Sequence, residues 1–353
     1  MEELFDRYIN TRKLQASTIG LYKQKLAMLY RKIIGSQNIE VRMTKTLDLF
    51  KKLDSSMEWV FDVEAVHNAI KEESIGSQKT IYSILAPLLN FINTDKSNEF
   101  GEIYRKKIFE FGEIISNNTK KQTITKPKLK QSWVDWKDIT QRYDEYVSNV
   151  GNGGLAIDNL DRNNTAFIAL SFMVLFCPRR SSCIEKLKVV MKPVSDEDYL
   201  EMDNEFNYIY LTKNKGKTTL VLNNYKTSQR YGRQKFILSD RFTKLLNLYM
   251  TTRFIPKGHE NDEMPFLIQK TLGNSPSHYP FTSAGISGII KKFMTDEFKM
   301  PNITTTDLRT IYITSWYNES NRYITEVETE SFKLGTSPSE FTKSYVKRKS
   351  EIS

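Results

Sequence analysis

The segment LFCPRRSSCIEKLKV, residues 175–189, joins a strongly apolar run to a pair of arginines. The apolar residues AFIALSFMVLFC that lead into it predict a buried helix. Either Arg179 or Arg180 can open the helix expected next. Opening at Arg180 places Ile184 and Leu187 together on one helical face, whereas opening at Arg179 places less apolar residues there. We therefore expect Arg180, rather than Arg179, to stand at the start of that helix.

Three later segments also combine a helix or hairpin pattern with a residue that can act on a phosphate. They are NNYKTSQRYGRQKFIL (223–238) with Lys226, TTTDLRTIYITSWY (304–317) with Arg309, and LGTSPSEFTKSYVK (334–347) with Tyr345. A single match of this kind carries little weight, because the chain has 18 tyrosines and 52 basic residues. The weight lies in the order of the four segments along the chain.

These four segments, in this order, resemble the catalytic motifs of the tyrosine recombinase family, to which the phage integrases belong. The resemblance covers roughly residues 133–347. In that family, an arginine begins a helix, a lysine lies in a hairpin just before a threonine, and a second arginine follows a leucine at a helix start. The nucleophilic tyrosine follows a Leu-Gly pair. The matching residues are Arg180, Lys226, Arg309 and Tyr345.

The resemblance implies a reaction that needs neither a metal ion nor another cofactor. Tyr345 would attack the phosphorus and form a 3′-phosphotyrosyl link, which stays reversible because phenolate leaves readily. Arg180 and Arg309 would hold the phosphate oxygens, since guanidinium binds phosphate bidentately and keeps its charge. Lys226 would protonate the departing 5′-oxygen. The implied partners are double-stranded DNA and further copies of the chain, with a tetramer assembling on the DNA.

Three positions depart from the family pattern. Cys183 replaces a residue that is usually acidic, and Thr306 and Thr336 stand where the family has histidines. Threonine can donate a hydrogen bond to phosphate, but it is not a useful base at neutral pH. The group that deprotonates Tyr345 therefore stays open. His278, in a loop before the Arg309 segment, is the first alternative.

Hydrophobic periodicity predicts a mainly α chain with one small antiparallel β-sheet. Residues 1–115 show helical patterns only, with a helix capped by Thr18 and another following Ser77, and they suit the family's helical core-binding domain. Residues 132–353 would form the α+β catalytic domain, with strands at 208–212, 218–222 and 234–238. The polar segment 116–131 would be a linker that also contacts DNA. Its lysines are Lys120, Lys121, Lys126, Lys128 and Lys130.

Composition is compatible with this interpretation and excludes several others. A net charge of +10 suits a polyanionic partner, because lysine and arginine displace counterions from phosphates. Two cysteines and three scattered histidines favour neither a disulfide framework nor a zinc site. No apolar run approaches the roughly 20 residues that span a bilayer, and the first residues do not form a signal peptide. We expect an intracellular protein that acts on DNA.

Three alternatives remain at this point. A type IB topoisomerase shares the fold and the tyrosine chemistry, but the helical first domain and the short chain favour a recombinase. A DNA-binding protein of the same fold that has lost catalysis is the second, because both histidine positions are threonine. A metal-dependent transposase is disfavoured, since no carboxylate triad is evident. A composition rich in Lys, Asn and Ile hints at an AT-rich genome, such as that of a virus or mobile element, and thus at DNA integration.

Overall fold

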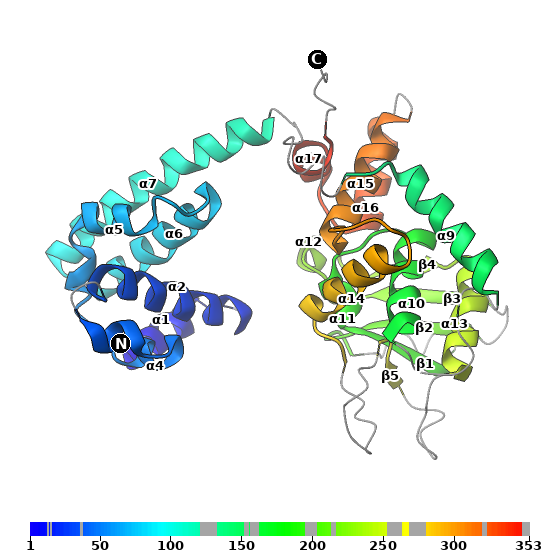
Figure 1. Cartoon of the computed structure of the whole chain (residues 1–353), viewed down its shortest axis with the longest axis horizontal. Coiled ribbons are helices and arrows are strands. Elements are labelled where there is room, and N and C mark those ends of the chain that lie inside the picture. Colours follow the sequence, from blue (N-terminus) through cyan, green and yellow to red (C-terminus); the bar gives the residue numbers. More distant parts are fainter. Residues whose placement is uncertain are drawn as a thin grey trace. The chain divides into compact units, whose positions relative to one another are not determined.

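The chain folds into two compact units, residues 1–121 and residues 122–353, shown in Figure 1 and each described here by itself. The computed structural model describes residues 1–12, 14, 16–35, 38–120, 133–151, 155, 162–194, 203–212, 217–252, 263–267, 280–319 and 323–347. The unit division falls inside the segment 116–131 that the sequence indicates as a linker.

The described part of the first unit is helical. It contains α1 (Glu2–Arg12), α2 (Ala16–Ile34), α3 (Ile39–Met43), α4 (Thr46–Lys51), a 3₁₀ turn (Glu58–Val60), α5 (Val63–Ile70), α6 (Ile75–Ile92) and α7 (Asp95–Lys120). The helical patterns predicted this class correctly. The aromatic ring of Tyr82 on α6 stacks against Tyr104 and Phe111 of α7, with ring centroids 5.5 and 5.7 Å apart. This pairing buries the apolar face of α6 that the sequence pattern predicts.

Three predicted boundaries in this unit were wrong. Thr18 does not cap α2, because the helix already begins at Ala16. The helix expected after Ser77 begins at Ile75, since the side chain of Ser74 accepts a hydrogen bond from the Ser77 amide and caps it. α7 continues to Lys120 and so extends five residues into the expected linker. Polar residues continue a helix readily on an exposed face, so polarity alone does not mark its end.

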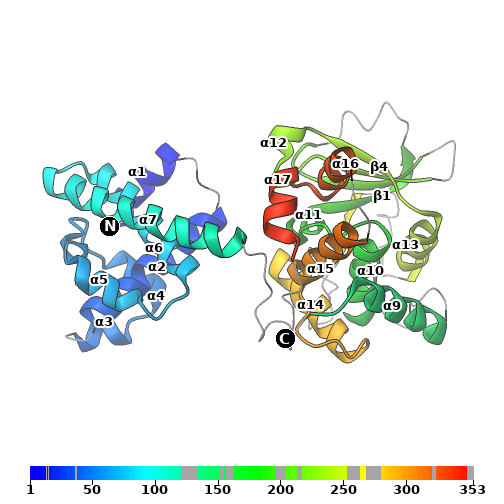
Figure 2. The same ribbon diagram turned by 90° about the horizontal axis from the view of Figure 1, so that it is seen from above.

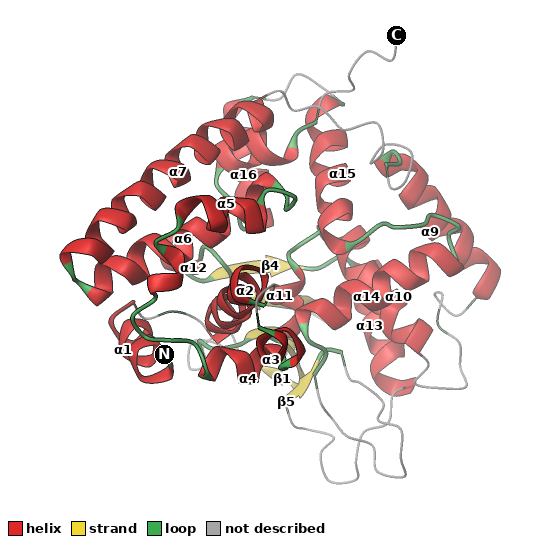
Figure 3. Ribbon diagram, turned by 60° about the vertical axis from the view of Figure 1, so that its left-hand side comes forward, coloured by secondary structure: helices red, strands yellow, loops and turns green. Residues whose placement is uncertain are grey.

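The second unit consists of helices and a small sheet, which Figure 3 colours red and yellow. Its helices are α9 (Trp136–Val150), α10 (Arg162–Leu175), α11 (Ser181–Glu185), α12 (Ser228–Tyr231), α13 (Asp240–Thr252), α14 (Ser283–Asp296), α15 (Thr305–Asn318), α16 (Ile324–Leu334) and α17 (Pro338–Glu340). Its strands are β1 (Leu187–Val194), β2 (Asn207–Thr212), β3 (Thr218–Leu222), β4 (Gln234–Ile237) and β5 (Glu263–Pro265). A π-helical turn, Phe341–Tyr345, follows α17.

The sheet is mixed, not antiparallel as the sequence pattern suggested. Its strand order is β4-β3-β2-β1-β5, and β1 pairs with β2 in parallel while the other neighbours are antiparallel. The three predicted strands form, but β1 and β5 were not predicted. Leu187 was expected on a helical face, whereas α11 ends at Glu185 and Leu187 begins β1. Val189 and Val190 favour a strand, and pairing on both sides overrides the helical pattern.

Strand alternation divides the sheet residues between two hydrophobic clusters. Val189, Ile209 and Leu220 belong to the main core of the unit, together with apolar residues of α10, α13 and α14. These helices lie on one side of the sheet in Figure 2. Tyr208, Tyr210, Val190 and Val221 point to the opposite face and form a smaller cluster. The sheet is therefore buried on both faces and gives the segments at its edge a rigid base.

Within the described residues, none of the helices is both long and apolar enough to cross a membrane.

Candidate functional site

Arg180 lies where the turn after α10 meets the start of α11. The Arg179 amide donates to the Cys177 carbonyl at 2.8 Å, and this tight turn sets the direction of the two arginine side chains. Arg180 is half-buried. Its Nη1 donates to the Gly335 carbonyl at 2.9 Å, and its Nη2 lies 3.3 Å from the Tyr345 hydroxyl oxygen.

Arg309 occupies the second turn of α15. A capping box, in which Thr304 and Asp307 exchange hydrogen bonds, fixes where α15 begins. The Arg309 side chain is only 2% exposed. Its Nη1 donates to the carbonyls of Pro178 and Leu334, at 3.0 and 2.9 Å. One nitrogen of Arg309 thus joins the turn before Arg180 to the end of α16.

Tyr345 ends the π-helical turn, in which the Val346 amide donates to the Phe341 carbonyl. Phe341 and Val346 are buried on either side of it, while Tyr345 itself is half-buried. The Thr314 hydroxyl on α15 donates to the Tyr345 carbonyl at 3.0 Å and accepts from the Lys347 amide at 3.1 Å. These contacts hold the backbone of Tyr345 against α15.

The Tyr345 phenol therefore contacts two cationic side chains. Its ring centroid lies 4.8 Å from the Arg309 guanidinium carbon, in a cation–π contact, while its hydroxyl faces Arg180. The structure thus brings together Arg180, Arg309 and Tyr345, three of the four residues that the sequence predicts for catalysis.

The fourth, Lys226, lies in the connection between β3 and β4, directly before α12. It is exposed. The next residue, Thr227, donates through its hydroxyl to the Gly335 carbonyl at 3.2 Å, the carbonyl that Arg180 also contacts. The Lys226 backbone is thus attached to the site, although the structure places no hydrogen bond between its ammonium group and Tyr345.

The two threonines at the family's histidine positions lie in different surroundings. Thr336 follows Gly335 and is only 1% exposed, and its amide donates to the Ser331 carbonyl in the turn that ends α16. Thr306 is exposed on the first turn of α15, where its carbonyl accepts from the Thr310 hydroxyl. Thr336 therefore belongs to the buried base of the site, and Thr306 lies at the surface.

The site holds two cationic side chains, Arg180 and Arg309, close to Tyr345. Burial lowers the pKa of Arg309, an effect that neighbouring Tyr345 opposes and the Arg180 charge reinforces. Arginine nevertheless keeps its proton. In the described part of the chain, Nε and Nη2 of Arg309 have no hydrogen-bond partner, and no carboxylate bonds to Arg180 or Arg309. Burying a cationic group without a counter-charge lowers the stability of the folded state, so an anion bound here would stabilise the unit.

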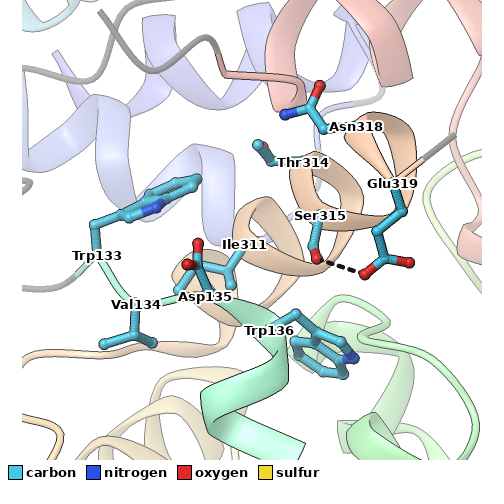
Figure 4. Close-up of a pocket in the computed structure, with 9 residues that line it drawn as sticks. All are labelled: Trp133, Val134, Asp135, Trp136, Ile311, Thr314, Ser315, Asn318 and Glu319. Carbon is cyan, nitrogen blue, oxygen red and sulfur yellow. Dashed lines mark hydrogen bonds between the residues drawn. The ribbon is translucent and has the colours of Figure 1, made fainter. Parts of the chain in front are cut away.

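A pocket of about 160 Å³ lies beside the site, on the other side of Thr314. Figure 4 shows Trp133 and Trp136 at its edges and the α15 side chains Thr314, Ser315 and Glu319 across from them. The Ser315 hydroxyl donates a hydrogen bond of 3.0 Å to the Glu319 carboxylate, and this pair forms a polar part of the pocket lining. The arginines do not line this pocket, so it is separate from the candidate site.

Several predicted residues fall outside the part of the chain that the structure describes. These are Lys121, Lys126, Lys128, Lys130 and His278, together with the side chain of Lys120. Among the described residues, no group of three or more His, Cys, Asp or Glu side chains could hold a metal ion.

Sequence reasoning missed two contributors to the site, the Gly335 carbonyl and the Thr314 hydroxyl. Gly335 has a signal, because a glycine after a helical pattern is the usual residue for the left-handed position that ends a helix, and its φ is +67°. Thr314 has no such signal in the sequence, because its role depends on the tertiary contact between α15 and the π-helical turn.

No protein-family model matches the chain, and no curated protein matches it either.

Proposed function

We propose that this protein cleaves and rejoins DNA through a 3′-phosphotyrosyl intermediate, as a site-specific recombinase or integrase of the tyrosine recombinase type. The observation that carries the proposal is the contact of the Tyr345 phenol with both Arg180 and Arg309. Three separate chain segments supply these residues. A tyrosine packed only for stability does not require two cations beside it.

The two arginines fit the charge that develops during cleavage. As the Tyr345 oxygen bonds to phosphorus, negative charge grows on the non-bridging oxygens of the phosphate. The Nη2 of the half-buried Arg180 is a donor that can stabilise it, and the buried Arg309 guanidinium adds its positive charge beside Tyr345. Their positions are fixed by other hydrogen bonds, so little reorganisation accompanies the reaction.

The remaining steps concern protons. The P–O5′ bond breaks as the P–O(Tyr345) bond forms, and Lys226 supplies the proton that the 5′-oxygen needs to leave as a hydroxyl. Solvent water takes the phenol proton of Tyr345, helped by the surrounding positive charge. Attack by a 5′-hydroxyl on the phosphotyrosine reverses every step and rejoins the strand.

The proposal extends to both units. The second unit would be the catalytic domain, and the first unit would be the core-binding domain. The lysines of the segment 116–131, Lys120, Lys121, Lys126, Lys128 and Lys130, would contact the phosphate backbone. Four copies would assemble on two duplexes for strand exchange, and the biological role would be integration of viral or mobile DNA.

A nicked DNA duplex tests the proposal. When cleavage releases a short fragment that diffuses away, rejoining fails and the covalent protein–DNA adduct accumulates. We expect an adduct that survives denaturant and disappears on proteolysis. Transfer of the bound strand to a second duplex distinguishes a recombinase from a topoisomerase.

A second candidate, a DNA-binding protein without catalysis, is favoured by one observation. Thr336 and Thr306 replace the family's histidines, and neither is a base at neutral pH. DNA binding without any adduct at any pH would support this candidate instead.

A further inference from the structure

Arg179 is completely buried, although it carries a charge and has no carboxylate partner among the described residues. Its guanidinium lies between the rings of Tyr225 and Phe236, 5.4 and 5.7 Å from their centroids. Its Nη2 donates to the side-chain oxygen of Gln234 at 2.5 Å. Gln234 in turn donates to the Phe332 carbonyl at 2.9 Å. Arg179 is thus linked to the last turn of α16, close to Gly335.

Arg179 also touches Gly335 directly. A β-carbon added to Gly335 would lie 2.6 Å from Arg179 Nη1, which is closer than side chains approach one another. Gly335 has a φ of +67°, so its conformation and its close approach both require glycine. The guanidinium of Arg179 therefore forms the surface against which the Gly335 turn rests.

The Gly335 carbonyl connects two segments that carry groups of the proposed reaction. It accepts from Arg180 Nη1 and from the Thr227 hydroxyl, which is next to Lys226. A shift of this carbonyl would move both donors relative to Tyr345. Misplacement of a catalytic group by about 1 Å can lower a rate by as much as about 100-fold.

We propose that Arg179 is a positioning residue for DNA cleavage. It fixes the turn at Gly335, whose carbonyl sets Arg180 and the Lys226 segment relative to Tyr345. Arg179 itself does not act on the phosphate, because its guanidinium packs against Tyr225 and Phe236 and bonds to Gln234, whereas Arg180 and Arg309 face Tyr345. This inference rests on the proposed function and adds to it a residue outside the four catalytic ones.

The first test is a cycle of Arg179→Met, Gly335→Ala and the double variant, measured as single-turnover cleavage at saturating DNA. We expect Arg179→Met to slow cleavage about 10-fold, with DNA affinity unchanged. Gly335→Ala should slow it at least as much. Gly335→Ala should slow cleavage much less in the Arg179→Met background than in the wild type. The guanidinium that the new methyl group would meet is absent from that background.

Gly151→Ala is a control for alanine at a positive φ away from the site. Gly151 has a φ of +70° but a ψ of −170°, outside the αL region that Gly335 occupies, and a β-carbon there meets nothing within 4 Å. It measures the effect of backbone strain without a contact to Arg179, and we expect normal cleavage. Melting temperatures of all variants identify any that fail to fold, and Arg179→Lys, which keeps the charge in a slimmer side chain, then replaces Arg179→Met.

A second test separates positioning from a general loss of structure. A DNA substrate with sulfur in place of the bridging 5′-oxygen releases a thiolate, which needs no proton from Lys226. The defect of Arg179→Met should shrink several-fold on this substrate, as should that of Lys226→Ala. The defect of Arg180→Ala should persist, since charge on the phosphate must still be stabilised.

The outcomes are distinct. If the wild-type protein forms no adduct, the proposed function fails and the role of Arg179 fails with it. If the wild type cleaves and Arg179→Met cleaves equally fast, only the role of Arg179 is wrong. Additive rate losses in the cycle would also overturn it, and a defect of Arg179→Met that the sulfur substrate leaves unchanged would overturn its action on the Lys226 segment.

Discussion

Arg180 and Tyr345 are 165 positions apart in the chain, yet the Nη2 of Arg180 lies 3.3 Å from the Tyr345 hydroxyl oxygen. Arg309 covers the ring of the same tyrosine. A phenol that faces two cations can act as a nucleophile towards a phosphate that the same cations hold. The predictions that follow test this relationship and its surroundings.

Replacing Tyr345 by phenylalanine should abolish the covalent adduct and leave DNA binding nearly unchanged. The substitution removes only the attacking oxygen, whereas duplex binding depends mainly on phosphate contacts made elsewhere. Adduct formation on nicked DNA and a binding titration measure the two properties. A persistent adduct would move the nucleophile to another tyrosine, with Tyr312, Tyr317 and Tyr323 tested next.

Arg180→Ala and Arg309→Ala should each slow cleavage by at least about 100-fold, the usual cost of removing one fixed donor to transition-state charge. Arg179→Ala should cost much less, because Arg179 is buried away from the phosphate. Single-turnover rates compare the three variants. A larger loss of cleavage rate for Arg179→Ala than for Arg180→Ala would make Arg179, and not Arg180, the arginine that holds the phosphate.

The wild-type cleavage rate should rise steadily with pH above neutrality. Without a histidine at position 306 or 336, it should show no early plateau near about 6.5, the usual pKa of histidine. Thr336→His should raise the rate near neutral pH if the buried position accommodates the ring. A pH–rate profile of both proteins checks this. A wild-type plateau near a histidine pKa would indicate another base, with His278 the first to replace.

Inorganic phosphate should stabilise the folded protein. It can bind beside Arg180 and Arg309, and a ligand that binds only the folded state raises the free energy of unfolding. For a unit of this size, each kcal/mol corresponds to a rise of about 2–4 °C in melting temperature. Thermal unfolding with phosphate, against sodium chloride at equal ionic strength, measures the effect. Arg309→Ala should reduce it, and an equal rise in that variant would argue against binding at this site.

Alkaline pH should destabilise the protein partly through Cys177. Burial raises the pKa of this thiol from 9.0 to about 11. Between these values the unfolded chain loses the proton while the folded chain keeps it, so stability is complete below pH 9.0 and falls as pH rises towards 11. The loss is on the order of 2 kcal/mol. Denaturant unfolding at both ends of this range should show a steeper fall for wild type than for Cys177→Ala, and parallel curves would refute the assignment.

The local patterns of the sequence predicted most of the helices and three of the five strands. Trp136–Val150, Asp240–Thr252 and Ser283–Asp296 have a clear apolar periodicity and form as helices. The strand from Leu187 was missed, because its apolar residues also satisfy a helical spacing and only pairing with β2 and β5 decides between the two. β5 has three residues, too few for a pattern.

The candidate site, too, could be predicted only in part from the sequence. Arg180, Arg309 and Tyr345 could be chosen from motif order, and they lie together. The buried contact of Arg179 with Gly335 could not be predicted, because the sequence offered Arg179 only as a less suitable alternative to Arg180. The assignment of roles to the two adjacent arginines depends on which way each side chain leaves the turn at Cys177, and that direction is a tertiary property.

The buried residues on either side of Tyr345 have a mechanical consequence for a covalent intermediate. Phe341 packs its ring against Trp316, 5.6 Å between centroids, and Val346 is also in the core. A DNA strand bonded to Tyr345 would therefore be tethered to a turn anchored at both ends. Tension on the strand would pass into the core around α15 and would not pull the phosphotyrosine out of reach of the incoming 5′-hydroxyl.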